Sequence, residues 1–291
     1  MTTKRALCVG LNEFANLPRA NWLYGCVNDA NDMAALLKSK YGFGPRDVTV
    51  LTDAAATKAA VMAKLESMVR LAEQGKVTHL VFSYSSHGTQ VPDLNGDEAD
   101  RADEAFVAYD LKQVGDHWDP KTVIVDDELA TLFARVPKGV LVEAYLDTCH
   151  SGSGLKAMDL LQGRRPKYLP PPTPVGLDDV TDRAVTPFVE GIAKGAKFKA
   201  GKARDAARAV GATTPVLFAA CRAEQTSSDA TFSGRNNGAF TYYLLKELKK
   251  KGTTPRADLL KLIRADLKAG RFDQVPQLEC AAASKKAKIG A

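Results

Sequence analysis

The chain has 291 residues, 45% of them hydrophobic and 25% charged, which is enough to bury the core of one large domain and excludes general disorder. The net charge of +6 divides into −6 over residues 1–150 (15 Lys and Arg against 21 Asp and Glu) and +12 over residues 151–291 (25 against 13). The basic excess lies among Ala, Gly and Pro without interleaved aromatic residues, so no nucleic-acid partner is expected. The first apolar run spans only about six residues, too few for a signal peptide or a membrane span, which predicts a cytoplasmic protein without membrane association.

Apolar, β-branched runs alternate with amphipathic segments over the first 150 residues. Strands are predicted at residues 5–11, 48–51, 78–84, 105–109 and 140–146, and helices at 28–40, 58–74 and 126–135. Asn28 and Thr57 are the expected N-caps of the first two helices, and Gly42 follows the end of the first. This alternation predicts an α/β fold, a three-layer α/β/α sandwich with a mainly parallel central sheet.

The periodic pattern fails between Gln162 and Thr214, where proline-rich sequence around Pro170 is followed by Gly- and Lys-rich sequence. About 50 residues without periodicity are better explained as a mobile loop or linker than as core. A strand at 215–220 and helices at 238–249 and 255–268 follow. The expected organisation is a large segment, 1–162, a linker or processing loop, 163–214, and a small segment, 215–291, that completes the same domain.

Two of the predicted strands end at reactive residues. The 78–84 run leads into Ser85, Ser86, His87 and Gly88, and the 140–146 run leads into Asp147, Thr148, Cys149 and His150. Because the parallel strands of an open sheet present their carboxyl ends to one crevice, we expect a thiol and an imidazole to meet there.

Cys149 is the strongest candidate nucleophile. The turn after it, Ser151-Gly152-Ser153-Gly154, leaves backbone N–H groups that can face negative charge, which together with a nearby imidazole favours the thiolate. A buried structural cysteine is the alternative, and that is the role expected for Cys8 and Cys221, which lie in apolar runs. The five cysteines are widely spaced without a CxxC pair, which indicates neither a disulfide framework nor a structural zinc site.

His87 is the expected base. It follows a strand and precedes Gly88, whose N–H can point at a substrate carbonyl and help to form an oxyanion hole. A metal-dependent hydrolase that uses His87, Cys149 and His150 is disfavoured, since adjacent residues rarely provide the ligand geometry.

The two strand ends and five further motifs resemble, in the same order, those of metacaspases, the caspase-like cysteine peptidases of bacteria, fungi, plants and protists. The further motifs are Gly25-Cys26-Val27-Asn28-Asp29-Ala30, Asp126-Asp127-Glu128-Leu129, Cys221-Arg222-Ala223-Glu224-Gln225-Thr226, Gly238-Ala239-Phe240-Thr241 and Gln274-Val275-Pro276-Gln277-Leu278. The resemblance covers nearly the whole chain. It implies a caspase-like sandwich of the compact prokaryotic type without a pro-domain, and it favours a monomer.

By that resemblance, His87 and Cys149 form the catalytic dyad of a peptidase that cleaves after Arg or Lys rather than after Asp. Asp29 and Asp147 match the two pocket carboxylates of the family, with Ser85 alongside. A basic side chain independently requires a carboxylate in its pocket. Without the resemblance, Asp29 equally serves the first turn of its helix, and Asp147 equally caps the segment after Cys149.

The acidic residues from Asp93 to Glu104 do not form an EF-hand, since Glu98 occupies the position that requires glycine. In the resembling family, carboxylates bind an activating calcium ion, helped by an acidic residue seven positions after the nucleophile. The equivalent carboxylates here are Asp103, Asp126 and Asp127. The position after the nucleophile is Lys156, whose charge opposes Ca²⁺ binding, and a solvated acidic loop is an equal alternative.

The sequence thus predicts a cysteine endopeptidase that acts on protein or peptide substrates with Arg or Lys before the cleaved bond and needs no cofactor for its chemistry. The loop presents basic residues in accessible chain, which predicts self-cleavage between Arg164 and Arg204. These residues include Arg164, Arg165, Lys167, Lys194, Lys197 and Lys199. The alternative is a catalytically silent caspase-like module that binds partners, which the presence of both dyad residues and both pocket aspartates disfavours.

Overall fold

A six-stranded sheet forms the centre of the computed structural model, which describes residues 3–92, 102–149, 163–173, 213–222, 225–250 and 254–290. The strand order is β14, β11, β9, β3, β1, β2. The bounds are β1 Lys4–Gly10, β2 Val48–Thr52, β3 His79–Ser85, β9 Leu141–Asp147, β11 Val216–Ala219 and β14 Gln277–Glu279. All adjacent pairs are parallel except β11 and β14, which confirms the predicted mainly parallel sheet.

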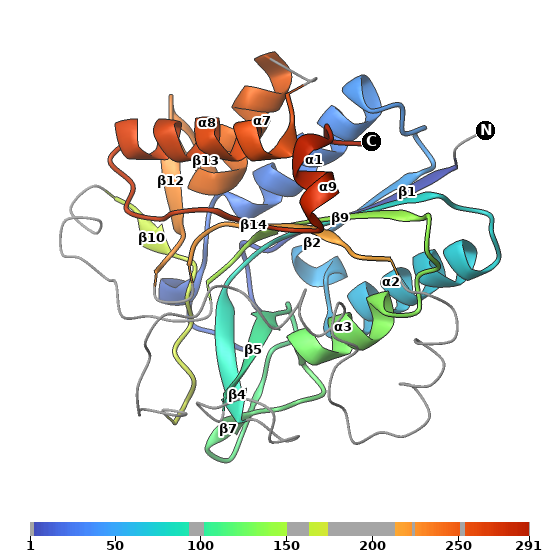
Figure 1. The fold of residues 1–291 in the computed structure, drawn as a ribbon. Coiled ribbons are helices and arrows are strands. Elements are labelled where there is room, and N and C mark those ends of the chain that lie inside the picture. Colours follow the sequence, from blue (N-terminus) through green and yellow to red (C-terminus); the bar gives the residue numbers. More distant parts are fainter. Residues whose placement is uncertain are drawn as a thin grey trace.

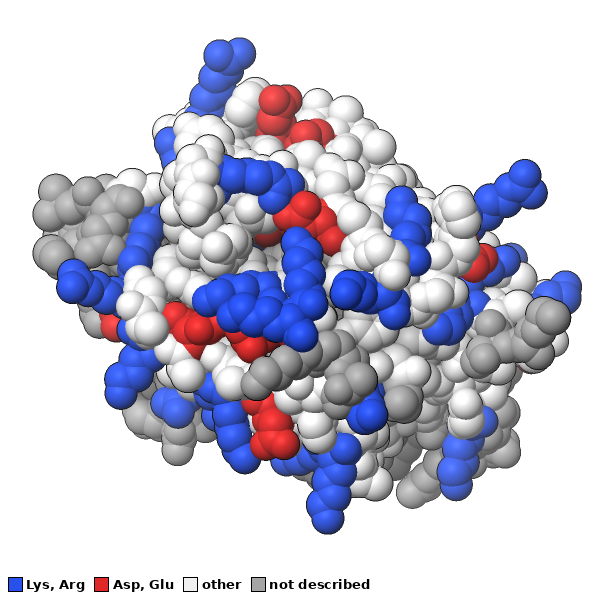
Figure 2. All heavy atoms as spheres, turned by 90° about the horizontal axis from the view of Figure 1, so that it is seen from above, with Lys and Arg blue, Asp and Glu red and all other residues white. Residues whose placement is uncertain are grey.

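Helices cover both faces of this sheet, which confirms the predicted three-layer sandwich (Figure 1). On one face lie α1 (Cys26–Lys40), α7 (Ala239–Lys250), α8 (Arg256–Ala269) and α9 (Ala282–Lys286), and on the other lie α2 (Lys58–Glu73) and α3 (Asp126–Phe133). The view from above shows Lys and Arg side chains spread among acidic and uncharged ones (Figure 2). None of the helices in the described ranges is long and apolar enough to cross a membrane.

Small sheets and turns complete the described fold. The antiparallel sheet β4-β5-β8 consists of β4 (Gly88–Pro92), β5 (Ala102–Val107) and β8 (Val123–Val125). A second sheet, β10-β12-β13, consists of β10 (Arg165–Pro166), β12 (Ser228–Phe232) and β13 (Arg235–Gly238), and a two-stranded ribbon consists of β6 (Gln113–Val114) and β7 (His117–Trp118). Two short 3₁₀ helices are η1 (Arg19–Asn21) and η2 (Asp53–Ala55). Since β4 starts three residues after β3 ends, the first small sheet extends from the edge where the reactive residues were predicted.

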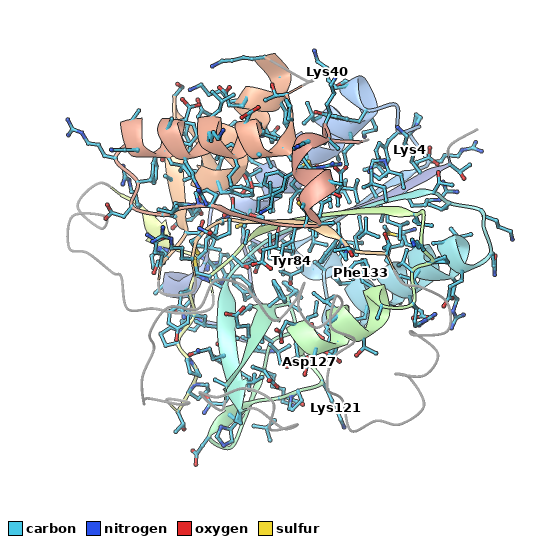
Figure 3. All side chains as sticks on the ribbon, viewed as in Figure 1. Lys4, Lys40, Tyr84, Lys121, Asp127 and Phe133 are labelled. Atoms are coloured by element: carbon cyan, nitrogen blue, oxygen red, sulfur yellow. The ribbon has the colours of Figure 1, made fainter. Side chains whose placement is uncertain are left out.

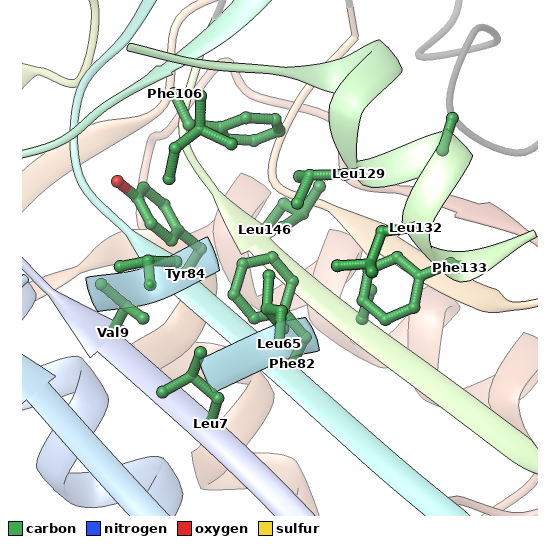
Figure 4. Close-up of a cluster of buried hydrophobic side chains, with 14 of the residues drawn as sticks. Leu7, Val9, Leu65, Phe82, Tyr84, Phe106, Leu129, Leu132, Phe133 and Leu146 are labelled. Carbon is green, nitrogen blue, oxygen red and sulfur yellow. The ribbon is translucent and has the colours of Figure 1, made fainter. Parts of the chain in front are cut away.

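The alternation of side chains along the strands creates one core on each side of the sheet. In β3, Leu80, Phe82 and Tyr84 pack with α2 and α3, whereas Val81 packs with α1 and α7. Figure 4 shows Phe82 and Tyr84 among side chains from β1, α2 and α3. Complete burial of a side chain of this size stabilises the fold by about 1.5–3 kcal/mol. The two cores therefore hold the ends of the central strands in fixed positions.

Helix α1 begins two residues before Asn28, the predicted N-cap, because a side chain from an earlier part of the sequence caps its first N–H groups. The side-chain oxygen of Asn12 accepts hydrogen bonds from the N–H groups of the first two residues of α1, at 2.9 and 3.2 Å. Asn28 instead donates to the carbonyl oxygen of Asn236, at 2.8 Å. The predicted cap of α2 is confirmed, since the Thr57 side chain accepts a hydrogen bond from an N–H group in the first turn of that helix.

The first part of the predicted linker is packed against the domain. Strand β10 pairs with β12, and Lys167 is fully buried. The prediction of accessible chain at Lys167 is therefore wrong, because its ammonium forms ion pairs with two buried carboxylates, one of them 138 residues away in the sequence. Lys194, Lys197, Lys199 and Arg204 lie outside the described residues.

Candidate functional site

The ends of β3 and β9 place the two predicted reactive residues at the same edge of the sheet. These strands are parallel neighbours, and Ser85 lies opposite Asp147 in their register. His87 and Cys149 each follow two residues later, and their exposed fractions are 4% and 0%. The imidazole and the thiol therefore lie at neighbouring strand ends, as the sequence pattern predicts.

The three predicted pocket residues surround a buried cation. The Lys167 ammonium lies 3.1 Å from Asp147 Oδ1 and 3.3 Å from Asp29 Oδ2, and it donates to Ser85 Oγ at 2.8 Å. The Ser85 hydroxyl donates to Asp29 Oδ2 at 2.7 Å. A Cβ atom at Gly238 would overlap the Asp147 carboxylate and the Lys167 ammonium, so any other residue there would displace these side chains. We call Asp29, Ser85 and Asp147 the acidic pocket.

Hydrogen bonds from β13 and α7 orient both carboxylates of the acidic pocket. Asp29 accepts from the Gly238 N–H and from the Asn237 side chain, both at 2.9 Å. Asp147 accepts from the N–H and the hydroxyl of Thr241, at 3.0 and 2.7 Å. Residues of the predicted small segment, 215–291, thus orient two carboxylates that belong to the predicted large segment, 1–162.

The pocket is electrostatically suited to a cation. Burial raises the pKa of Asp29 to about 7, with Lys167 acting against burial and Asp147 adding to it. For Lys167, burial favours the neutral amine, but Asp147 and the other surrounding anionic groups outweigh burial and raise the pKa well above its ordinary value. Lys167 is therefore charged in this site.

The backbone around Lys167 is held as an added strand. Its N–H donates to the Ser227 carbonyl at 2.9 Å, in continuation of the antiparallel pairing of β10 with β12. Its carbonyl oxygen accepts hydrogen bonds from the N–H groups of Gly88, at 2.9 Å, and Cys149, at 3.2 Å. Two backbone donors on one carbonyl oxygen, beside a thiol residue, are the arrangement that stabilises negative charge developing on that oxygen.

The Cys149 sulfur is engaged with groups other than His87. It accepts a hydrogen bond from the Ser227 N–H and lies 3.2 Å from the sulfur of Cys221. The contact with Cys149, and then burial, raise the pKa of the Cys221 thiol well above its ordinary value. Cys8 is a buried core residue as predicted, whereas Cys221, for which the same role was predicted, is buried against the candidate nucleophile.

The His87 ring is oriented by a backbone carbonyl. Its Nε2 lies 2.7 Å from the carbonyl oxygen of Asn21, and its ring packs on Phe14 with 5.4 Å between centroids. Because a carbonyl oxygen only accepts, Nε2 carries the proton and Nδ1 presents its lone pair, which has no hydrogen-bond partner among the described residues. Burial lowers the pKa of His87 to about 4, which keeps the ring neutral. A groove of about 570 Å³ passes this ring between η1 and residues 163–170.

The predicted calcium ligands lie on β5 and α3. Asp103 and Asp126 are each 6% exposed, and burial, followed by the charge of Glu104 and that of Asp127, raises the pKa of Asp126. Figure 3 shows Asp127 at the start of α3, on the opposite side of the sheet from α7 and α8. Within the described ranges, no group of three or more His, Cys, Asp and Glu side chains is arranged to hold a metal ion. His150 and Lys156 lie outside those ranges.

Sequence reasoning missed two kinds of site residue. Lys167 was recognised as basic, but its sequence context, after a proline in an aperiodic segment, indicated exposure. Asn21 and Ser227 contribute backbone atoms, which no side-chain pattern reveals. A sequence signal did exist for Cys221, because this residue begins one of the motifs that resemble those of metacaspases.

The chain resembles caspase-domain proteins along nearly its whole length. The family model of the caspase domain, Peptidase_C14, matches residues 3–288. The chain is 32% identical over 297 residues to Metacaspase-1 of Cryptococcus neoformans and 30% identical over 299 residues to Metacaspase-1 of Ajellomyces capsulatus. These alignments cover 94% and 95% of this chain, and the chain spans 62% and 79% of the length of those two relatives.

Two solved structures share the fold. A crystal structure of a Geobacter sulfurreducens protein covers 99% of this chain and 98% of its own, with a TM-score of 0.65 and 25% identity. The structure of Caspase-1 from Spodoptera frugiperda covers 96% of this chain and 86% of its own, with a TM-score of 0.55 and 13% identity. The second likeness concerns the fold alone.

Proposed function

The chain belongs to the caspase-domain family of cysteine peptidases, and we propose that it hydrolyses peptide bonds after Lys or Arg with a dyad of His87 and Cys149. One observation carries this proposal. The chain's own Lys167 has its ammonium in the acidic pocket, while its carbonyl oxygen accepts from the N–H groups of Gly88 and Cys149. A substrate with a basic residue before the cleaved bond needs this same pair of contacts, because the side chain then positions the carbonyl for attack.

In the proposed mechanism, the Cys149 sulfur leaves its contacts with Ser227 and Cys221 and turns toward the carbonyl carbon. His87 Nδ1 takes the thiol proton as the sulfur forms a bond to that carbon. The N–H groups of Gly88 and Cys149 stabilise the oxyanion. His87 then gives its proton to the leaving amine as the C–N bond breaks, and a water molecule, deprotonated by His87, hydrolyses the thioester and restores the thiol.

The same contacts support self-cleavage at the bond between Lys167 and Tyr168. This bond lies within the predicted window from Arg164 to Arg204, and its carbonyl oxygen already accepts two backbone hydrogen bonds. Cleavage there, followed by departure of the segment, would open the acidic pocket to other substrates.

A silent partner-binding module is the second candidate, and two observations favour it. The Cys149 sulfur contacts Ser227 and Cys221, and the chain itself fills the acidic pocket. In this alternative, Lys167 is a permanent part of the fold.

A fluorogenic panel with Arg, Lys or Asp before the dye separates the two candidates. We expect cleavage after Arg and Lys but not after Asp, and at least about a thousandfold loss in the Cys149→Ala variant. Undiminished cleavage by that variant would falsify the nucleophile assignment. Failure of the wild-type protein to cleave any peptide, with its own chain intact by mass spectrometry, favours the silent module. A Lys167→Gln variant should lose the self-cleavage product that ends at residue 167, and a thiol alkylating agent should abolish all cleavage.

Calcium is proposed as an activator and not as a participant in the chemistry. Asp103 and Asp126 offer buried carboxylate oxygens of the kind that Ca²⁺ prefers, with Asp127 beside them, whereas Lys156 opposes binding. The panel is therefore repeated with Ca²⁺ and with a chelator. A rise in activity with Ca²⁺ that an Asp126→Asn variant lacks supports this role, and equal activity in both conditions contradicts it.

A further inference from the structure

Two arginines of the segment that fills the acidic pocket also have side chains held by specific contacts. Counted back from the bond between Lys167 and Tyr168, Arg165 is the third residue before the bond and Arg164 is the fourth. Successive side chains of an extended strand point to opposite faces. The two guanidinium groups accordingly reach two different parts of the domain.

The Arg164 guanidinium lies on the loop that follows α8. Its two terminal nitrogens donate to the carbonyl oxygens of Arg271 and Gly270, at 2.6 and 2.9 Å, and its central carbon lies 3.8 Å from the centre of the Phe272 ring. Phe272 is only 8% exposed and packs on Phe232, with 5.8 Å between ring centroids. The ring is therefore a fixed surface, and the two carbonyl oxygens define where a planar cation rests on it.

The Arg165 guanidinium lies on η1 and on the chain between η1 and α1. One terminal nitrogen donates to the carbonyl oxygens of Ala20 and Trp22, at 3.0 and 2.9 Å, and the other donates to the Tyr24 hydroxyl at 2.8 Å. Its central carbon lies 4.4 Å from the centre of the Tyr24 ring. Tyr24 is 48% exposed, so this surface is accessible from solvent.

Both binding places belong to the body of the domain and not to the segment that occupies them. The groups that accept from the two arginines lie 106 to 145 residues away in the sequence. They are backbone carbonyls and aromatic side chains of packed elements, so they remain when the segment leaves.

We propose that these two places are substrate subsites, which bind arginine at the third and fourth positions before the cleaved bond. This inference rests on the proposed peptidase function and specifies its substrate class: extended, multibasic protein segments of the type Arg-Arg-Pro-Lys. Each subsite combines oxygen acceptors with an aromatic face, which suits a planar guanidinium with several N–H donors. A lysine ammonium is a compact charge that cannot stack on the ring and bridge two carbonyl oxygens in one plane, so arginine is preferred.

Four fluorogenic peptides test the two subsites on the full chain. Their sequences before the dye are Arg-Arg-Pro-Lys, Ala-Arg-Pro-Lys, Arg-Ala-Pro-Lys and Lys-Arg-Pro-Lys. We expect each alanine to lower kcat/KM roughly tenfold, and lysine at the fourth position to fall between arginine and alanine. Ratios between peptides on one enzyme preparation cancel the concentration of competent enzyme. Equal kcat/KM for all four overturns the subsites but leaves the proposed function intact, whereas cleavage of none overturns both.

Matched variants assign each preference to its subsite. In Phe272→Leu, the ratio of kcat/KM for arginine over alanine at the fourth position should fall below about threefold, while the ratio at the third position is kept. In Tyr24→Ala, the ratio at the third position should fall and the ratio at the fourth should be kept. The control is Phe43→Leu: Phe43 also carries a cation over its ring, with the Lys4 ammonium 5.3 Å from the centroid, but it packs on His79 at the opposite end of β3. Thermal unfolding of each variant checks its fold. If the control changes the peptide ratios as much as Phe272→Leu does, the assignment is wrong.

Discussion

Strands β3 and β9 carry a buried ion cluster at each end, and the two clusters differ in how the cation is held. Where the strands begin, the Glu143 carboxylate accepts from Arg256 at 2.7 Å and pairs with His79 at 2.9 Å. Where they end, Lys167 lies between the two carboxylates of the acidic pocket. Arg256 is the first residue of the core helix α8, whereas Lys167 belongs to a segment held by one added strand and its side chains. The first cluster is part of the fold, and the second resembles an occupied binding site.

The two clusters also differ in the sign of their contribution to stability. Burial acts to raise the pKa of Glu143, but His79 and Arg256 outweigh it and lower the pKa, so the ionised Glu143 adds stability that is lost only as the pH falls through its pKa in the folded protein. Burial raises the pKa of Asp29 to about 7, so its contribution is present at low pH and is lost as the pH rises through about 7. At neutral pH, ionisation of Glu143 stabilises the folded protein, whereas ionisation of Asp29 opposes folding. The two ends therefore contribute to stability with opposite dependence on pH.

Removal of the cation from the Glu143 cluster should have the largest effect. An Arg256→Met variant leaves a buried carboxylate without its fully buried cation, so we expect a loss of about 3–5 kcal/mol in the free energy of unfolding, or a fall in Tm on the order of 10 °C. Peptide cleavage per folded molecule should stay within about twofold of wild type, because this cluster is far from the acidic pocket. Lys261→Met, which removes an exposed ion pair with Asp258, is the control and should cost less than about 1 kcal/mol. Equal losses in the two variants would contradict the structural role of the cluster.

Removal of charge from the pocket end should instead affect catalysis. Asp147→Asn keeps the size of the side chain but removes a charge that faces the basic group, so kcat/KM for Lys peptides should fall about a hundredfold or more. Its loss of unfolding free energy, measured by denaturant titration, should be smaller than that of Arg256→Met. Asp266→Asn, which removes a surface partner of Lys246, serves as the control. The comparison fails if Asp147→Asn leaves kcat/KM unchanged and destabilises the fold.

The sequence predicts well which residues meet at the carboxyl ends of β3 and β9, because the relevant pattern is local. Apolar, β-branched runs must end where polar residues begin, and β3 ends at Ser85, within one residue of its predicted end. The two interpretations of Asp29 are also compatible, since it lies in the first turn of α1 and its side chain forms part of the acidic pocket. The local sequence pattern thus predicts which side chains lie at the edge of the sheet, but it does not predict their hydrogen-bond and ion-pair partners.

Partners that lie far away in the chain account for what the sequence did not predict. A lysine is almost never fully buried unless it is paired, and one partner of Lys167, Asp29, lies 138 residues before it. The distant cap that Asn12 supplies to α1 is another example, because local rules favour Asn28. Such contacts follow only from the completed sheet.

The buried His87 makes a pH-dependent contribution to the free energy of unfolding, and its size lies between the effects expected for Arg256→Met and Lys167→Met. His87 has a pKa of about 4 in the folded protein and about 6.5 when unfolded, so the unfolded chain binds a proton first, and its contribution to stability falls by about 2 kcal/mol between pH 7.5 and pH 5. Asp29 acts in the opposite direction, so the quantity to measure is the difference in unfolding free energy between wild type and His87→Gln at each pH. That difference should shrink by about 2 kcal/mol toward pH 5. A constant difference for His87→Gln would mean that the ring is not buried as a neutral base.

The smallest stability effect, and the most direct test of the comparison, is expected from Lys167→Met. We expect its segment to detach in this variant and to let water reach the acidic pocket, so that no carboxylate stays buried without a cation. The loss of unfolding free energy should then be about 1 kcal/mol, well below that of Arg256→Met. An emptied pocket raises the fraction of binding-competent molecules, so the initial rate of Lys-peptide cleavage should rise several-fold while self-cleavage at residue 167 disappears. Lys167→Arg is the matched control, since it keeps the charge and should keep self-cleavage. If Lys167→Met costs as much stability as Arg256→Met and does not raise the peptide rate, Lys167 is a permanent part of the fold, and the two ends of the strands are alike.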